Sequence, residues 1–242
     1  MKQYEAVINT LEKLGGQATL AELYCEVMKI GDCKWETKTP FASIRRIVQV
    51  RPEIFKVRPG LWALRSYQTR LSLSEYSKTK QQTTEAAQQT HSYYQGLVVI
   101  IGNLREFSTY VPNQDKNRLF VDRPLKEMRS LQTIPSFSYD YFVKRSETVD
   151  VLWFNGRLMP NSFFEIEHST DIQNSLLKFQ DLQDFHARMV IVANEHRQAE
   201  FEQKMNRRPF DEFKERVKFL TYGTLVRQYE YEVYKNSQTF VV

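Results

Sequence analysis

The chain is poor in cysteine and has no long hydrophobic run. Its 242 residues include two cysteines, Cys25 and Cys33, whose spacing is neither that of paired metal ligands nor that of a disulfide framework. The longest apolar stretch, residues 97–101, is far too short to cross a bilayer, and the first residues are polar and charged, unlike a signal peptide. These absences predict reduced thiols, no membrane association and a cytoplasmic protein.

The formal net charge of +5 is unevenly distributed along the sequence. Residues 1–66 carry 11 Lys and Arg against 7 Asp and Glu, whereas residues 92–242 carry 20 of each. A basic excess at one end is typical of a surface that binds nucleic acid. A solvated surface with a few extra lysines gives the same sum and stays open as an alternative.

A polar segment divides the chain into two units. Residues 71–89 are rich in Ser, Thr, Gln, Lys and Glu and contain few large apolar residues. Such a composition predicts a solvated linker or an exposed polar helix. We therefore expect a small domain over residues 1–66, a polar linker over 67–91 and a larger domain over 92–242.

The periodicity of the first unit predicts three helices and a hairpin. Apolar residues recur at helical spacing over residues 4–14. Thr19 and Glu22 form a capping box for a second helix, and Pro40 suits the first turn of a third. The apolar runs that follow flank the turn residues Arg58, Pro59 and Gly60, which predicts a hairpin.

Residues 37–64 resemble the winged-helix units, including the HARE type, that are attached to restriction-like nucleases. The resemblance implies a third helix in the major groove of DNA and a wing on the phosphate backbone. It gives six candidate DNA-binding residues: Thr39, Ser43, Arg45, Arg46, Lys56 and Arg58. The alternative is a basic face that makes protein contacts or none.

Two glutamates lie one residue apart in an apolar run of the second unit. Glu165 and Glu167, within residues 163–168, share one face of an extended strand. An earlier apolar run, residues 149–154, carries Asp150 near its start. Buried carboxylates are costly unless they are paired or bind a cation, and carboxylates on two neighbouring strands suit Mg²⁺. The pattern predicts metal-dependent phosphodiester hydrolysis. An exposed edge strand with solvated glutamates is the alternative.

Helical and extended patterns alternate through the second unit. We expect helices over residues 93–107, 171–185, 195–206 and 224–234, and further strands over 109–112, 188–193 and 217–220. The resulting order, α-β-β-β-α-β, is that of a restriction-endonuclease-like core. The fold class expected for the whole chain is α/β, with a mixed sheet in this core and a small winged-helix domain before it.

Residues 92–234 resemble the PD-(D/E)XK nuclease superfamily. The resemblance rests on Asp150, on Glu165 and on the run 164–170, which is followed by residues 176–179, Leu-Leu-Lys-Phe. It implies that the two carboxylates are catalytic and hold Mg²⁺, for which Mn²⁺ can substitute.

The resemblance also implies a third metal ligand, the carbonyl oxygen of Ile166. The sequence departs from the superfamily pattern at Glu167, where most members have lysine, and at Val149, where many have proline. Glu167 is expected to orient the attacking water or to act as its general base. Lys178, on the following helix, is the candidate replacement for the missing lysine; a solvated helix lysine is the alternative.

These features favour a Mg²⁺-dependent endonuclease that cleaves double-stranded DNA, resembling a type II or modification-dependent restriction enzyme. Cleavage of both strands by a protein with one such site would require a homodimer. Two other functions stay open. One is a DNA-binding regulator whose nuclease fold is inactive because the motif lysine is absent. The other is a nuclease of repair or of a toxin.

Overall fold

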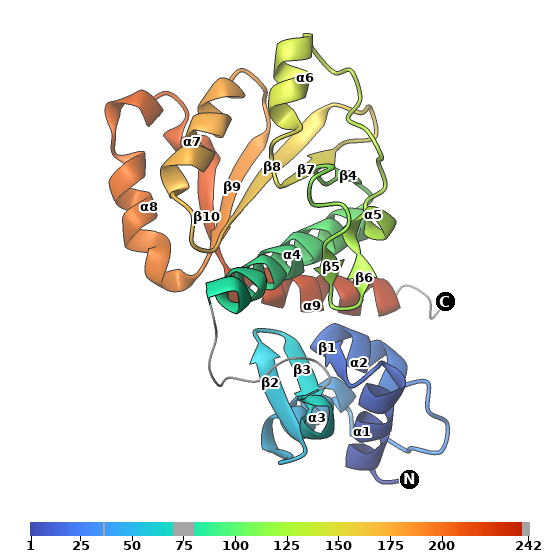
Figure 1. Cartoon of the computed structure of the whole chain (residues 1–242). Helices are drawn as coiled ribbons and strands as arrows, with labels where there is room; N and C mark the ends of the chain where they lie inside the picture. Colours follow the sequence, from blue (N-terminus) through green and yellow to red (C-terminus); the bar gives the residue numbers. More distant parts are fainter. Residues whose placement is uncertain (36, 70–79, 239–242) are drawn as a thin grey trace. The chain divides into compact units, whose positions relative to one another are not determined.

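The chain forms two compact units. The structure, a computed structural model, describes residues 1–35, 37–69 and 80–238 (Figure 1). One unit is Met1–Lys78 with Glu230–Val242, and the other is Thr79–Tyr229. Part of the expected linker, residues 70–79, lies outside the described residues. Within the described residues, no helix has both the length and the apolar character that a membrane span requires.

The N-terminal unit contains the expected three helices and hairpin. The antiparallel hairpin β2–β3 is joined by β1, in the order β1-β3-β2. The capping box is confirmed, because Thr19 Oγ1 accepts from the Glu22 amide at 3.2 Å and Glu22 accepts from the Thr19 amide at 2.7 Å. Its elements are α1 (Gln3–Lys13), β1 (Gln17–Thr19), α2 (Leu20–Val27), α3 (Pro40–Val50), β2 (Ile54–Arg58), β3 (Leu61–Leu64) and the 3₁₀ turn η1 (Arg65–Tyr67).

The second unit is built on a five-stranded mixed sheet, so the predicted α/β class is confirmed. The strand order is β10-β9-β8-β7-β4. Neighbours are antiparallel from β4 to β8 and parallel from β8 to β10. The strands are β4 (Ser108–Tyr110), β7 (Val151–Phe154), β8 (Pro160–Glu167), β9 (Arg188–Ala193) and β10 (Val217–Thr221). Because β8 is the middle strand, the alternative of an exposed edge strand is wrong.

Helices cover both faces of this sheet (Figure 1). The long helix α4 packs against β4, β7 and β8, and α7 packs against β8 and β9. The helices are α4 (Lys80–Leu104), α5 (Leu125–Met128), α6 (Asp140–Ser146), α7 (Ile172–Asp181), α8 (Gln198–Met205) and the first part of α9 (Tyr222–Gln238), whose residues from Glu230 onward belong to the other unit. A small hairpin, β5 (Leu119–Phe120) with β6 (Arg123–Pro124), and the 3₁₀ turns η2 (Glu195–Arg197), η3 (Arg208–Phe210) and η4 (Lys214–Arg216) complete the unit.

Helix α4 starts earlier than the sequence predicted. The expectation was a helix from residue 93, preceded over residues 71–89 by a linker or a polar helix; the helix begins at Lys80, so the helical alternative is the right one from there on. The added residues are largely Gln, Thr, Glu and Ala, without Gly or Pro, so they extend a helix that is anchored by its buried part from Tyr93 onward. Close packing of this anchored part shows at Gly102, where an added Cβ would lie 2.5 Å from Trp153 Nε1.

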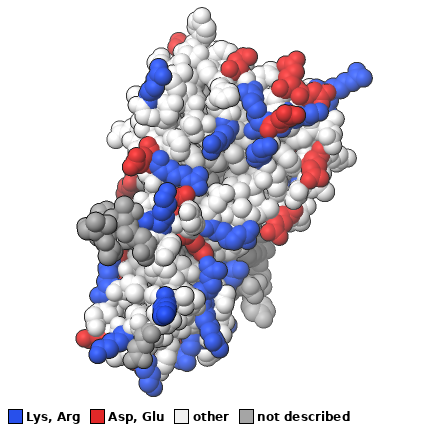
Figure 2. All heavy atoms as spheres, turned by 180° about the vertical axis from the view of Figure 1, so that it is seen from behind, with Lys and Arg blue, Asp and Glu red and all other residues white. Residues whose placement is uncertain are grey.

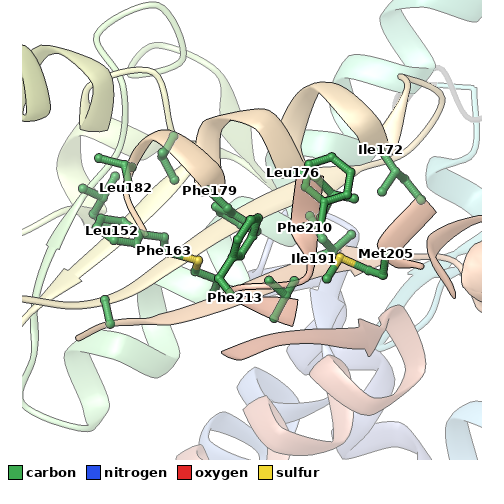
Figure 3. Close-up of a cluster of buried hydrophobic side chains, with 14 of the residues drawn as sticks. Leu152, Phe163, Ile172, Leu176, Phe179, Leu182, Ile191, Met205, Phe210 and Phe213 are labelled. Carbon is green, nitrogen blue, oxygen red and sulfur yellow. The ribbon is translucent and has the colours of Figure 1, made fainter. Parts of the chain in front are cut away.

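A hydrophobic core lies between the sheet and the helices α7 and α8 (Figure 3). Phe163 of β8 is fully buried in it, with Leu176 and Phe179 of α7. Because side chains alternate along a strand, Glu165 and Glu167 follow Phe163 on the face that α7 covers. The carboxylates are therefore placed where an apolar core ends at the carboxyl end of the middle strand.

Candidate active site

The predicted acidic residues meet at the carboxyl end of β8. Glu165 is 2% exposed and Glu167 is 4% exposed, so both are buried. Asp150 directly precedes β7, which runs antiparallel to β8. Its Oδ2 accepts a hydrogen bond of 2.7 Å from the amide of Ile166, between the two glutamates. The structure thus brings together the three carboxylates that the sequence singled out.

Lys178 is directed at Glu165. Its Nζ donates to Oε2 at 2.8 Å and to Oε1 at 2.9 Å, and to the carbonyl of Thr148 at 2.8 Å. These three contacts use all three hydrogens of the ammonium group. The Ser175 hydroxyl, one helical turn earlier on α7, also lies 2.8 Å from Glu165 Oε2. The alternative of a solvated helix lysine is therefore wrong.

The pKa values of Asp150 and Glu165 are shifted in opposite directions. Burial, together with the charge of Asp150, raises the pKa of Glu165 to about 8, although Lys178 and Ser175 act in the other direction. Burial also opposes ionisation of Asp150, but the hydrogen bond and charge of His91 outweigh it and hold that pKa below its usual value. A buried carboxylate with a raised pKa beside an ionised one forms a site that a cation would stabilise.

Glu167 sits in a polar cage. The hydroxyl groups of Thr170 and Ser175 donate to its two carboxylate oxygens. The guanidinium of Arg197 lies 3.7 Å from Oε2 of Glu167, and Arg197 is buried, with 8% of its surface exposed. Arg197 itself donates to the Thr170 carbonyl at 2.6 Å and to Glu200 at 2.9 Å. An ionised carboxylate has about four lone-pair sites, so Glu167 retains capacity for a water molecule.

The sequence analysis missed His91, Ser175 and Arg197. His91 Nε2 lies 3.1 Å from Asp150 Oδ2, and the pKa of His91 is raised: burial lowers it, but the hydrogen bond and charge of Asp150 outweigh burial. His91 fell in the segment interpreted as a linker. Gln95 could have indicated His91. Gln95 is a polar residue among apolar ones on its helix face, and His91, four positions earlier, lies on the same face. Nothing in the local sequence marked Arg197.

His91 and Ser175, with the acidic residues described above, line a pocket of about 410 Å³. The three carboxylates and Lys178 form part of it, and His91, Asp115 and Arg118 form another part. Within residues 1–35, 37–69 and 80–238, no three His, Cys, Asp or Glu side chains are grouped as metal ligands. Mg²⁺ takes one or two protein carboxylates and keeps several waters, so a pair of carboxylates with one backbone carbonyl fits this ion.

The predicted DNA-binding residues of the N-terminal unit differ in their surroundings. Arg45 Nε donates to the Tyr24 hydroxyl at 3.2 Å, and its guanidinium forms an ion pair with Glu230 of α9. Arg46 and Lys56 are exposed, whereas Thr39, Ser43 and Arg58 are exposed or partly buried on the same helix–hairpin segment. On the face in Figure 2, this unit presents Lys and Arg with few Asp and Glu, while the second unit presents both signs.

Comparison with known proteins places most of the chain in one family. A family model described as "Type II restriction enzyme NmeDI C-terminal domain" matches residues 72–238. The Type II restriction enzyme NmeDI of Neisseria meningitidis serogroup C is 31% identical over 114 residues. This match covers 43% of the chain and 32% of that relative, so it spans about a third of the relative's length. No solved structure matches the chain.

Proposed function

The chain belongs to the family of the Type II restriction enzyme NmeDI C-terminal domain, and on this premise we propose that it is a restriction-type DNA endonuclease that depends on Mg²⁺. The observation that carries the proposal is the ammonium of Lys178 on the buried carboxylate of Glu165, with the Asp150 carboxylate bonded to the next amide. A lysine and two acidic residues in this relation supply the charges that phosphodiester hydrolysis requires.

Asp150, Glu165 and the carbonyl of Ile166 would hold the cation. Bound there, Mg²⁺, or Mn²⁺ in its place, would polarise the scissile phosphate and lower the pKa of the attacking water. Support comes from the donor set, which is all oxygen, and from the raised pKa of Glu165, which burial and the neighbouring Asp150 cause.

The remaining side chains would act on the phosphate and the water. Lys178 stabilises negative charge that develops on the phosphate, in the role that a strand lysine has in most of the PD-(D/E)XK nucleases that the site resembles. Glu167 orients the water and accepts its proton. Ser175, whose hydroxyl lies between Glu165 and Glu167, holds the two carboxylates at a fixed separation.

The N-terminal unit would bind the duplex as a winged helix. Its order of three helices and a hairpin, and its basic excess, support this assignment. Helix α3 would enter the major groove, with β2 and β3 as the wing. Because the described residues of each chain hold one such set of carboxylates, cleavage of both strands at one site calls for a homodimer.

The test uses the purified full chain and plasmid DNA prepared with and without base methylation. We expect linear products in Mg²⁺ and in Mn²⁺, and intact plasmid in excess EDTA. Binding of the duplex without cleavage of any plasmid in either metal would contradict the proposal and favour the DNA-binding regulator.

A further inference from the structure

A second positively charged side chain, that of Arg118, lines the pocket, and most of its hydrogen-bond donors have no protein acceptor in the described residues. Lys178 and Arg118 are the pocket's two lining residues with a permanent positive charge. Lys178 directs all three hydrogens at protein acceptors. Arg118 makes an ion pair through Nε, 3.1 Å from Asp115 Oδ1, and its side chain is 35% exposed. In the part of the chain that the structure describes, its two terminal NH₂ groups have no side-chain or backbone acceptor.

Asp115, the ion-pair partner of Arg118, is buried and is linked through a hydrogen-bonded glutamine to Asp150. Asp115 is 2% exposed, and its Oδ2 accepts from Gln95 Nε2 at 3.0 Å. The same Nε2 donates to the backbone carbonyl of Asp150, also at 3.0 Å. An amide NH₂ group has two hydrogens, and Gln95 uses both to fix Asp115 relative to Asp150. The position of Arg118 is therefore tied to the candidate active site.

The backbone around Arg118 is held as firmly as its side chain. Its amide donates to the Asp115 carbonyl at 2.9 Å, and its carbonyl accepts from the Leu125 amide at 2.9 Å. The carbonyl of the next residue, Leu119, accepts from the Ser92 hydroxyl of α4 at 2.6 Å. Since α4 also carries His91 and Gln95, the same helix supports both the guanidinium and the carboxylates.

We propose that Arg118 is a further substrate-binding residue, which holds a backbone phosphate of the DNA strand that enters the pocket, with Asp115 and Gln95 as positioning residues. The inference rests on the proposed function and deepens it. A guanidinium with two free NH₂ groups matches two oxygens of a phosphate.

The test compares duplex binding by full-length variants over a range of salt concentrations, in EDTA so that metal-dependent cleavage is prevented. The probe is a short duplex of mixed sequence. Log K falls as log salt rises, and loss of one phosphate contact reduces the magnitude of this negative slope by about 0.9. We expect that loss for Arg118→Gln, and a slope close to wild type for Arg118→Lys, which keeps the charge. Arg123→Gln is the matched control, because Arg123 is exposed on the same hairpin but does not line the pocket.

A second readout separates binding from positioning. In Mg²⁺, Asp115→Asn should keep the wild-type salt slope and lower the cleavage rate, because the guanidinium remains but is no longer fixed. Thermal unfolding of each variant verifies that it is folded. Two results would overturn the role of Arg118 alone, provided that the wild type binds and cleaves DNA. One is a salt slope in Arg118→Gln that equals that of the wild type. The other is a change of slope in Arg123→Gln as large as that in Arg118→Gln. A wild type that neither binds nor cleaves duplex DNA would overturn the proposed function and this inference with it.

Discussion

The ammonium nitrogen of Lys178 lies 2.8 and 2.9 Å from the two carboxylate oxygens of Glu165. Lys178 lies on α7. In the PD-(D/E)XK motif that this site resembles, the lysine instead follows the glutamate by two residues on the same strand, at the position of Glu167 here. A positive charge is thus present at the carboxylate although the strand lacks it. The absence of the motif lysine is therefore a weak argument for an inactive site.

Replacing Lys178 tests whether this charge acts in cleavage. We expect Lys178→Met to reduce the single-turnover cleavage rate about 10²- to 10³-fold, the scale for one preorganised electrostatic donor. Lys178→Arg should keep part of the rate, because it keeps a charge on the same helix. Lys218→Met, an exposed lysine on β10 outside the pocket, is the control. A wild-type rate in Lys178→Met would remove this residue from the mechanism.

Replacing Glu167 tests the source of the general base. Glu167→Gln keeps the size and most hydrogen bonds of the side chain but removes its charge. We expect a loss of cleavage of about 10²-fold or more, which is typical of a positioned acid–base group. The measurement is single-turnover cleavage against pH for both proteins. If the two rates match across the pH range, Glu167 has no part in proton transfer and Lys178 becomes the residue to examine.

Arg197 should contribute to stability through the same carboxylate. Its side chain is 9% exposed, and truncation to Met would leave the buried Glu167 without its cationic partner. Breaking a buried pair by removing one member costs about 3–5 kcal/mol. We expect a loss of this size in the free energy of unfolding from urea denaturation. Arg188→Met, an exposed arginine on β9, should change it by about 0.5 kcal/mol or less. Equal losses in the two variants would contradict a specific role for the buried pair.

The two arginines in the middle of α3 should respond differently to substitution. Arg45 is paired with Glu230 and Tyr24, so DNA must compete with these partners for it. Arg46 is exposed on the same helix. In the full chain we expect Arg46→Gln to weaken duplex binding more than Arg45→Gln does, in mobility shifts at several salt concentrations. A larger loss for Arg45→Gln would mean that DNA displaces Glu230, and no loss for either would contradict the winged-helix reader.

Local patterns were sufficient to predict much of the fold. The strand over residues 188–193 has its predicted bounds, and the Thr19 capping box is present. Alternation along residues 163–168 placed Glu165 and Glu167 on one face, and the structure buries both. These features depend on neighbours in the sequence, so hydrophobic period and capping chemistry determine them.

Contacts between distant segments were not predictable in the same way. His91, Asp150 and Lys178 meet only because α4, β7 and α7 converge at the end of β8. The early turns of α4 are polar, so their composition resembles a linker more than a helix. The link from Arg118 through Asp115 to Gln95 lies in a region without clear periodicity, where only tertiary packing fixes the side chains.

The central claim is that Asp150 and Glu165 form the cleavage site, and one comparison tests it most directly. Plasmid cleavage in Mg²⁺ and duplex binding are measured side by side for wild type, Asp150→Ala, Glu165→Ala and the exposed control Asp122→Ala. Because the two carboxylates act on the transition state more than on bound DNA, we predict that either substitution abolishes cleavage and leaves binding largely intact, while Asp122→Ala cleaves as wild type does. Full cleavage by purified Asp150→Ala or Glu165→Ala, or by the wild type in excess EDTA, would contradict the account.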